Sequence, residues 1–87
     1  MTATTKLRVT VTDAWDTVTV VAGAEMTIAE LKQQALRLAL GWQPDPSIYE
    51  VKYRGALMLD ERCRVADLNL PDGAPMIVLP IRRRPVR

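Results

Sequence analysis

Residues 27–41 read TIAELKQQALRLALG and form the one stretch of this chain that is long and periodic enough for a full helix. Thr27, followed three residues later by Glu30, is a capping box, in which each side chain bonds a backbone amide at the start of the helix. Gly41 suits the left-handed conformation that ends a helix. The sequence therefore predicts one helix with sharply marked ends.

The apolar residues of this helix indicate which side faces the core. Polar residues such as Lys32 fall mostly outside one stripe at helical spacing, which consists of Ile28, Leu31, Ala35 and Leu38. We expect a second apolar group to cover the edge of the same core, namely Leu36, Leu40 and Trp42.

Strands are predicted on both sides of the helix, because apolar and polar residues alternate there or apolar residues run without a break. The expected strands are residues 7–12, 17–22, 48–53, 57–59 and 76–79. Residues 65–70 suit a short helical turn that plugs the end of the core before the last strand. The order ββαββ predicts an α+β fold.

Length, composition and charge favour one soluble domain followed by a basic tail. The chain has 87 residues, of which 48% are hydrophobic, and no apolar run approaches the roughly 20 residues that span a bilayer. One cysteine cannot form an internal disulfide, which favours a cytoplasmic setting, and the rich Ala, Arg and Val usage suggests a bacterial source. We expect a domain over residues 1–81 with net charge −2 and a flexible tail over 82–87 that holds Arg82, Arg83, Arg84 and Arg87.

Enzymatic chemistry is not expected. The chain has no histidine, its single Cys63 has no neighbouring base, and its carboxylates are scattered over turns. No nucleophile–base pair or metal set can be assembled from these residues, so we predict no catalytic residue, no cofactor and no metal.

Trp15 lies in the loop that joins the first two predicted strands, and two interpretations of it remain open. Its side chain either folds back over the sheet edge or stands out as a binding anchor, since tryptophan is enriched among the residues that dominate interfaces.

Several segments in their order along the chain resemble ubiquitin. They are the helix start at 27–32, the turn at 53–55, residues 59–61, the plug at 65–70 and the last strand within 71–79. The chain thus resembles the ubiquitin-like β-grasp family from Leu7 to Leu79, with small insertions before Ile48 and near Met58. The resemblance implies a mixed five-stranded sheet packed on one helix, with the first and last strands parallel at its centre.

The resemblance also implies a surface for a partner protein. If Met76 and Val78 face the helix, then Ile77 and Leu79 face away from it, where ubiquitin-like domains present their partner-binding patch. Lys52 replaces the isoleucine at the centre of the family's patch, and Trp15 stands in place of its bordering loop leucine. The candidate partner-binding residues are Arg8, Trp15, Lys52, Ile77 and Leu79.

Apolar residues ringed by Arg and Lys favour a partner with an apolar ridge and an acidic rim. The alternative is that Ile77 and Leu79 are strand formers, partly covered by the stems of Arg8 and Lys52 and by Trp15.

Conjugation in this family needs a C-terminal Gly-Gly, and the four glycines here are Gly23, Gly41, Gly55 and Gly73. The resemblance therefore implies a non-conjugating member, and it disfavours the sulfur carriers that use the same diglycine. In size and lack of diglycine the chain is similar to ubiquitin-like accessory proteins of bacterial type VII secretion and to small β-grasp subunits of bacterial multicomponent monooxygenases.

We expect an adaptor or accessory subunit that docks a larger protein through the sheet face opposite the helix, and a homodimer through that face stays open. The alternative is weak docking of the arginine tail to nucleic acid or an anionic surface, because guanidinium groups bind phosphate. Four charges without interleaved aromatic residues make nucleic acid an unlikely partner. The tail could equally be a solubilising terminus.

Overall fold

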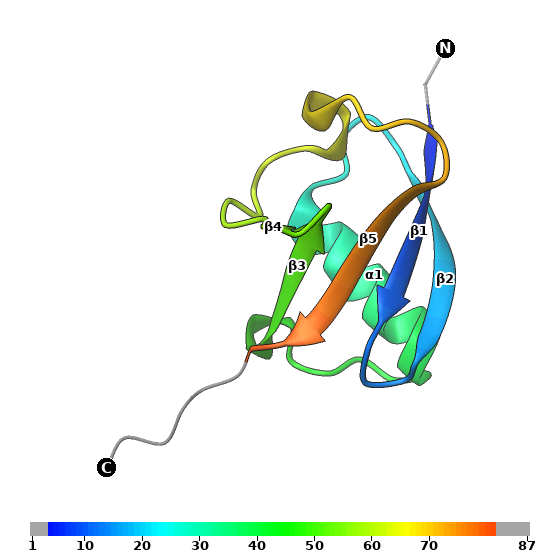
Figure 1. Ribbon diagram of the computed structural model, residues 1–87, viewed down its shortest axis with the longest axis vertical. Helices are drawn as coiled ribbons and strands as arrows, with labels where there is room; N and C mark the ends of the chain where they lie inside the picture. Colours follow the sequence, from blue (N-terminus) through cyan, green and yellow to red (C-terminus); the bar gives the residue numbers. More distant parts are fainter. Residues whose placement is uncertain (1–3, 82–87) are drawn as a thin grey trace.

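The computed structural model describes residues 4–81 of the chain. One helix, α1 (Ile28–Leu40), lies across one face of a five-stranded sheet (Figure 1). The strands are β1 (Thr5–Val11), β2 (Asp16–Ala22), β3 (Tyr49–Tyr53), β4 (Ala56–Leu57) and β5 (Ala74–Pro80). Two short 3-10 helices precede β3 and β5, namely η1 (Pro46–Ile48) and η2 (Val65–Leu68). The predicted basic tail, residues 82–87, lies outside the described residues.

The sheet has the strand order β2-β1-β5-β3-β4. β1 and β5 run parallel at its centre, and the pairs β1–β2, β3–β5 and β3–β4 are antiparallel. The first and last strands of the chain are therefore neighbours. This mixed sheet with one helix confirms the predicted α+β layout.

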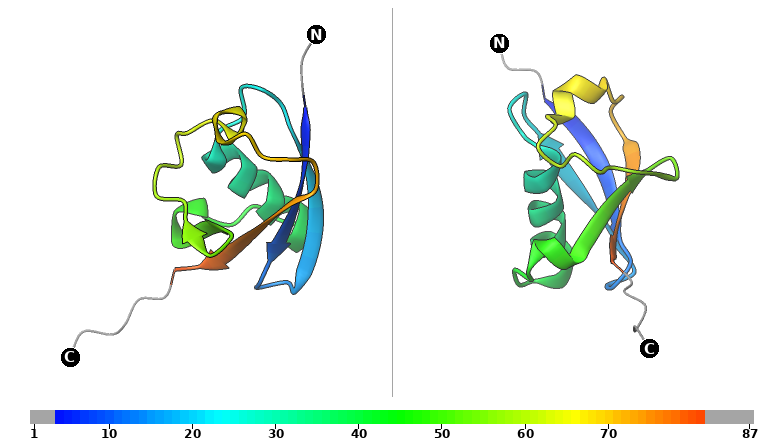
Figure 2. Two further views of the ribbon diagram at one scale, coloured as in Figure 1. Left: turned by 45° about the horizontal axis from the view of Figure 1, so that its top comes forward. Right: turned by 90° about the vertical axis from the view of Figure 1, so that its left-hand side faces the viewer.

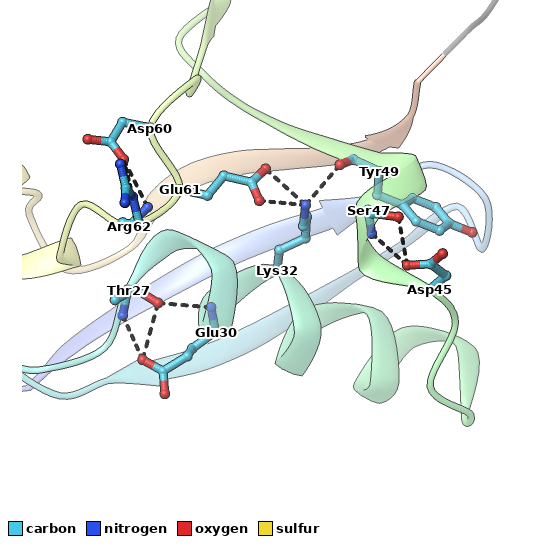
Figure 3. Close-up of polar contacts among 9 residues, drawn as sticks. All are labelled: Thr27, Glu30, Lys32, Asp45, Ser47, Tyr49, Asp60, Glu61 and Arg62. Atoms are coloured by element: carbon cyan, nitrogen blue, oxygen red, sulfur yellow. Dashed lines mark hydrogen bonds and ion pairs between the residues drawn. The ribbon is translucent and has the colours of Figure 1, made fainter.

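The ends of α1 follow from the two signals in the sequence. The Glu30 amide donates to Thr27 Oγ1 over 3.2 Å, and the Thr27 amide donates to Glu30 Oε1 over 3.0 Å (Figure 3). Gly41 ends the helix with φ of 80°, in the left-handed region. Within residues 4–81 no helix reaches the length and apolar character of a membrane span, and α1 has only 13 residues.

The buried side of α1 differs from the predicted stripe. The helix buries Ile28, Leu31, Lys32, Ala35 and Leu36. Leu38 was expected in the core and is 53% exposed, whereas Leu36 was expected at the edge and is fully buried. The five buried residues are separated by three, one, three and one positions, which is the spacing of one side of a helix. Because Lys32 is one of them, this side does not read as a continuous apolar stripe in the sequence. Trp42, at 59% exposed, does not cover the core edge as predicted, whereas Leu40 packs partly buried against it.

The core lies between α1 and the facing side of the sheet. Alternate residues of the two central strands are buried there, namely Leu7, Val9, Val11, Ala74, Met76 and Val78. Val65 of η2 is buried and Leu68 and Leu70 pack against the core, which confirms the predicted plug.

The fourth strand is shorter than predicted and begins one residue earlier. A two-residue turn of Arg54 and Gly55, both with positive φ, places Ala56 opposite Tyr53. Pairing ends at Leu57. The predicted strand over residues 57–59 is therefore wrong, because a tight turn starts the pairing at once and Leu59 points into solvent.

Candidate functional site

The side of the sheet opposite α1 carries the predicted partner-binding residues. α1 covers one side of the sheet, and among the described residues no helix covers the other side (Figure 2). We call this second side the open face. Its outward side chains are those of Lys6, Arg8, Thr10, Thr17, Thr19, Val21, Glu50, Lys52, Leu57, Pro75, Ile77 and Leu79.

Ile77 lies at the centre of the open face. Strand pairing places it between Thr10 of β1 and Lys52 of β3, and Leu57 of β4 lies opposite Lys52. Ile77 is 42% exposed and Leu57 is 41% exposed, although both belong to paired strands. The prediction that Ile77 faces away from the helix is confirmed, because Met76 and Val78 on either side of it are buried.

The other predicted residues lie in rows on either side of Ile77. Arg8 is paired with Pro75, one row toward the start of β5, so it is a diagonal neighbour of Ile77. Leu79 is paired with Glu50, one row toward the end of β5, and is half-buried. The structure thus brings Arg8, Ile77 and Leu79 onto one surface with Lys52.

Trp15 stands out from the loop between β1 and β2 at the Leu79 end of the open face. Its side chain is 86% exposed, so the interpretation that it folds back over the sheet edge is wrong. Its backbone has φ of 49°, a left-handed conformation that bulky residues seldom adopt. A hollow of about 390 Å³ beside it, here called the Trp15 hollow, is lined by Thr12, Asp13, Trp15, Leu79 and Pro80.

The Asp13 carboxylate in this hollow is held from the core side. The Tyr49 hydroxyl donates to Asp13 Oδ2 over 2.7 Å, and the Tyr49 carbonyl accepts a hydrogen bond from Lys32 Nζ over 3.0 Å. The bond to Asp13, burial of the ring and the nearby negative charge raise the pKa of Tyr49 to about 12. The raised pKa means that Tyr49 keeps its proton, and its bond to Asp13, to a higher pH than an ordinary tyrosine.

Lys32 itself belongs to the supporting structure and not to the surface. Its ammonium lies 2.7 and 2.9 Å from the two oxygens of Glu61, and its side chain is only 4% exposed (Figure 3). Glu61 is partly open to solvent. This pair fixes the loop before η2 and the start of β3 against α1.

Asp13, Glu50 and Leu57 contribute to this surface and were not among the predicted site residues. The alternation of β3 already placed Glu50 on the same side as Lys52. The Arg54-Gly55 turn could have revealed Leu57, because a two-residue hairpin loop sets the register of its strands. No signal in the sequence indicated that Asp13 would be bonded to Tyr49, 36 residues away.

No metal or catalytic site is evident in the part of the chain that the structure describes. Residues 4–81 hold no group of three or more side chains that could bind a metal ion. Cys63 is half-buried, and its Sγ lies 3.6 Å from the carbonyl oxygen of Arg64. A carbonyl cannot take up the thiol proton, so this contact does not activate the thiol.

No protein-family model matches this sequence, and neither does any curated protein sequence. Solved structures do match. Ubiquitin of Caldiarchaeum subterraneum superposes with a TM-score of 0.74 at 12% identity, covering 97% of this chain and 98% of that chain. The ubiquitin-like domain of tubulin-binding cofactor B gives a TM-score of 0.74 at 18% identity, covering 93% of each chain.

A ubiquitin-like domain of an Arabidopsis thaliana protein is similar as well, with a TM-score of 0.70 at 12% identity, covering 97% of this chain and 84% of that chain. At such low identity the likeness is one of fold. Together with the strand order and the single helix, it establishes that this chain has a ubiquitin-like β-grasp fold.

Proposed function

We propose that this protein is a non-conjugated interaction module that docks a larger partner protein on the open face. The observation that carries the proposal is the exposed apolar side chain of Ile77 on the central strand β5, with a second exposed apolar side chain, Leu57, in the same row of the sheet on the edge strand β4. An apolar centre with polar surroundings is the usual anatomy of a protein-binding surface. The ubiquitin-like fold is consistent with such a module.

Trp15 supports the proposal independently. The left-handed φ of this residue suits glycine or asparagine, so a tryptophan there costs backbone strain of roughly 1 kcal/mol or more. Packing within the chain does not offset this strain, because the Trp15 side chain is almost fully exposed. An exposed tryptophan beside Leu79 is of the residue type most enriched among the anchors of protein interfaces.

The charges of the open face bear on the kind of partner. Lys52 lies directly beside Ile77, and Arg8 lies one row away. Acidic groups on the partner would pair with these two side chains around its apolar ridge. Glu50, beside Leu79, interrupts the basic ring that the sequence suggested.

A binding role without covalent chemistry fits the remaining residues. The four glycines are isolated from one another, at positions 23, 41, 55 and 73. The described residues offer no metal cluster, and the sequence offers no histidine. These features favour an adaptor over a conjugated modifier or an enzyme.

A peptide display library selected against the full chain tests the proposal. We expect Ile77→Asp to weaken binding of the selected peptides at least about tenfold while the far-UV circular dichroism and the unfolding midpoint stay unchanged. Leu38→Asp is the matched control, because Leu38 is similarly exposed but lies on α1. Peptides that bind both variants as tightly as the original chain would refute the proposal.

Trp15→Gly gives a second variant that should fold, since glycine accepts the positive φ at this position. It should keep or slightly raise stability and lose affinity. Sedimentation of the free chain shows whether the docked protein is a second copy. In that case the mass would rise with concentration, and Ile77→Asp would abolish the rise.

A further inference from the structure

The Trp15 hollow lies at one end of the open face, beyond its apolar centre. Leu79 and Pro80 supply apolar surface, and the exposed indole of Trp15 supplies an aromatic face. Among residues 4–81, Asp13 is the one ionisable side chain in the lining. The hollow therefore combines apolar walls with a single negative charge.

This charge is fixed in place. Asp13 Oδ2 accepts the Tyr49 hydroxyl, and Tyr49 is itself buried and bonded through its carbonyl to Lys32. Among the described residues, Asp13 Oδ1 has no hydrogen-bond partner. A held carboxylate with one free oxygen loses little conformational freedom when a cation approaches it.

The charged side chains that the structure describes make this end of the open face acidic. Glu50 is the strand partner of Leu79, which lines the hollow. The basic side chains Lys52, Arg8 and Lys6 lie in successive rows toward the opposite end of the sheet. Within the described residues, the open face thus has an acidic end at Trp15 and a mainly basic end near the start of β1.

We infer that the Trp15 hollow binds a basic side chain of the docked partner, an arginine or a lysine. Its aliphatic stem would lie on Leu79 and Pro80, and its cationic head would stack on the Trp15 indole and pair with Asp13 Oδ1. An anionic side chain would be repelled by Asp13 and Glu50. Arginine fits best, because a planar guanidinium both stacks on an indole and bonds a carboxylate.

The inference rests on the proposed function and adds a direction to it. A partner segment must place its basic residue at the Trp15 end and its acidic residues toward Lys52 and Arg8. The reversed segment would put like charges together at both ends, which disfavours it. The open face therefore selects one orientation of its partner.

The test uses peptides selected from the display library against the full chain. In a selected peptide, the basic residue is replaced by citrulline, which keeps the shape of arginine and removes its charge. We expect this change to weaken binding to the original chain about tenfold. With Asp13→Asn, the citrulline replacement should weaken binding only about twofold, because the carboxylate that pairs with the basic side chain is gone.

Tyr49→Phe is the matched control, since it removes the bond to Asp13 and leaves the carboxylate. It should retain most of the loss caused by citrulline. An equal citrulline penalty in the original chain and in Asp13→Asn would overturn the inference. So would selected peptides that carry no basic residue but still depend on Ile77.

Two other results are distinguishable from that one. Peptides that are insensitive to Ile77→Asp would refute the proposed function itself. The chain's own arginines 82–84 and 87 are the competing occupants of the hollow. If replacing all four by glutamine changes Trp15 fluorescence in a Trp42→Phe background without any peptide, the tail fills the hollow and the assignment to a partner is overturned.

Discussion

Lys32 occupies a place on α1 that an apolar residue would ordinarily take. Its charge is tolerated because Glu61 and the Tyr49 carbonyl surround the ammonium. A lysine in a helix usually indicates the solvent side. No local pattern indicates that Lys32 pairs with Glu61, 29 residues further along the chain. The buried ion pair therefore could not be predicted from the sequence.

This pair leads to an asymmetric prediction. Glu61→Ala leaves a buried ammonium with one carbonyl partner and should lower the free energy of unfolding by about 3 kcal/mol. Lys32→Met removes the buried charge and leaves Glu61 partly solvated, so it should cost only about 1 kcal/mol. Urea denaturation of both variants measures the difference. A larger loss for Lys32→Met would contradict this account.

Tyr49 gives a pH-dependent prediction. Its pKa is raised from 10.0 to about 12 in the folded chain. The folded state therefore holds the phenol proton more tightly, and this contribution to stability is complete below pH 10 and is lost as the pH rises through 12. Tyr49→Phe should show a smaller fall in unfolding free energy from pH 10 to 12 than the original chain. Tyr53→Phe, which keeps the Asp13 bond, should behave like the original.

At the scale of elements, the ends of α1 were predictable and its buried side was not. Thr27, Glu30 and Gly41 mark the boundaries through local hydrogen bonds and backbone conformation, which depend on near neighbours. The buried side depends on how the helix crosses the sheet. In the sequence Leu38 resembles a core residue, because a lysine at position 32 is typical of the solvent side of a helix.

The corrected helix face is testable by matched substitutions on α1. Leu36→Lys should unfold the chain or cost more than about 4 kcal/mol, because it places an unpaired charge in the core. Leu38→Lys, two residues away, should change the unfolding free energy by less than about 0.5 kcal/mol. Thermal melts of the two variants measure the difference in stability. Similar losses of stability would contradict the observed burial and favour the apolar stripe that the sequence predicted.

At the scale of the whole molecule, the resemblance implied that the first and last strands are parallel neighbours, and alternation indicated which residues of a strand share a face. Residues 76–79 are all apolar, so the sequence placed Ile77 on the side away from the helix only on the condition that Met76 and Val78 face the helix, and both are buried. The sequence could not predict that the Asp13 carboxylate, which lines the Trp15 hollow, is held by a hydrogen bond from Tyr49. Non-local contacts of this kind have no signature within either segment.

Hydrogen exchange should reflect this architecture. β5 lies between β1 and β3, so both of its edges are paired, whereas β4 has two residues at the rim of the sheet. We expect amides of β1 and β5 to exchange only through global unfolding and those of residues 54–63 to exchange much faster. NMR exchange rates compared with the unfolding free energy from denaturation test this. Protection in β4 equal to that in β5 would contradict it.

The position of β5 also bears on how the chain is made. During translation, residues up to 73 are synthesised before β5. They contain the strand pairs β1–β2 and β3–β4 but not the strand that joins these pairs into one sheet. Such a nascent chain holds two separate hairpins, and the sheet face on which its helix packs lacks a central strand. Native structure must wait for the final strand, so a stalled or prematurely terminated product would display its apolar residues to the cell's quality-control machinery.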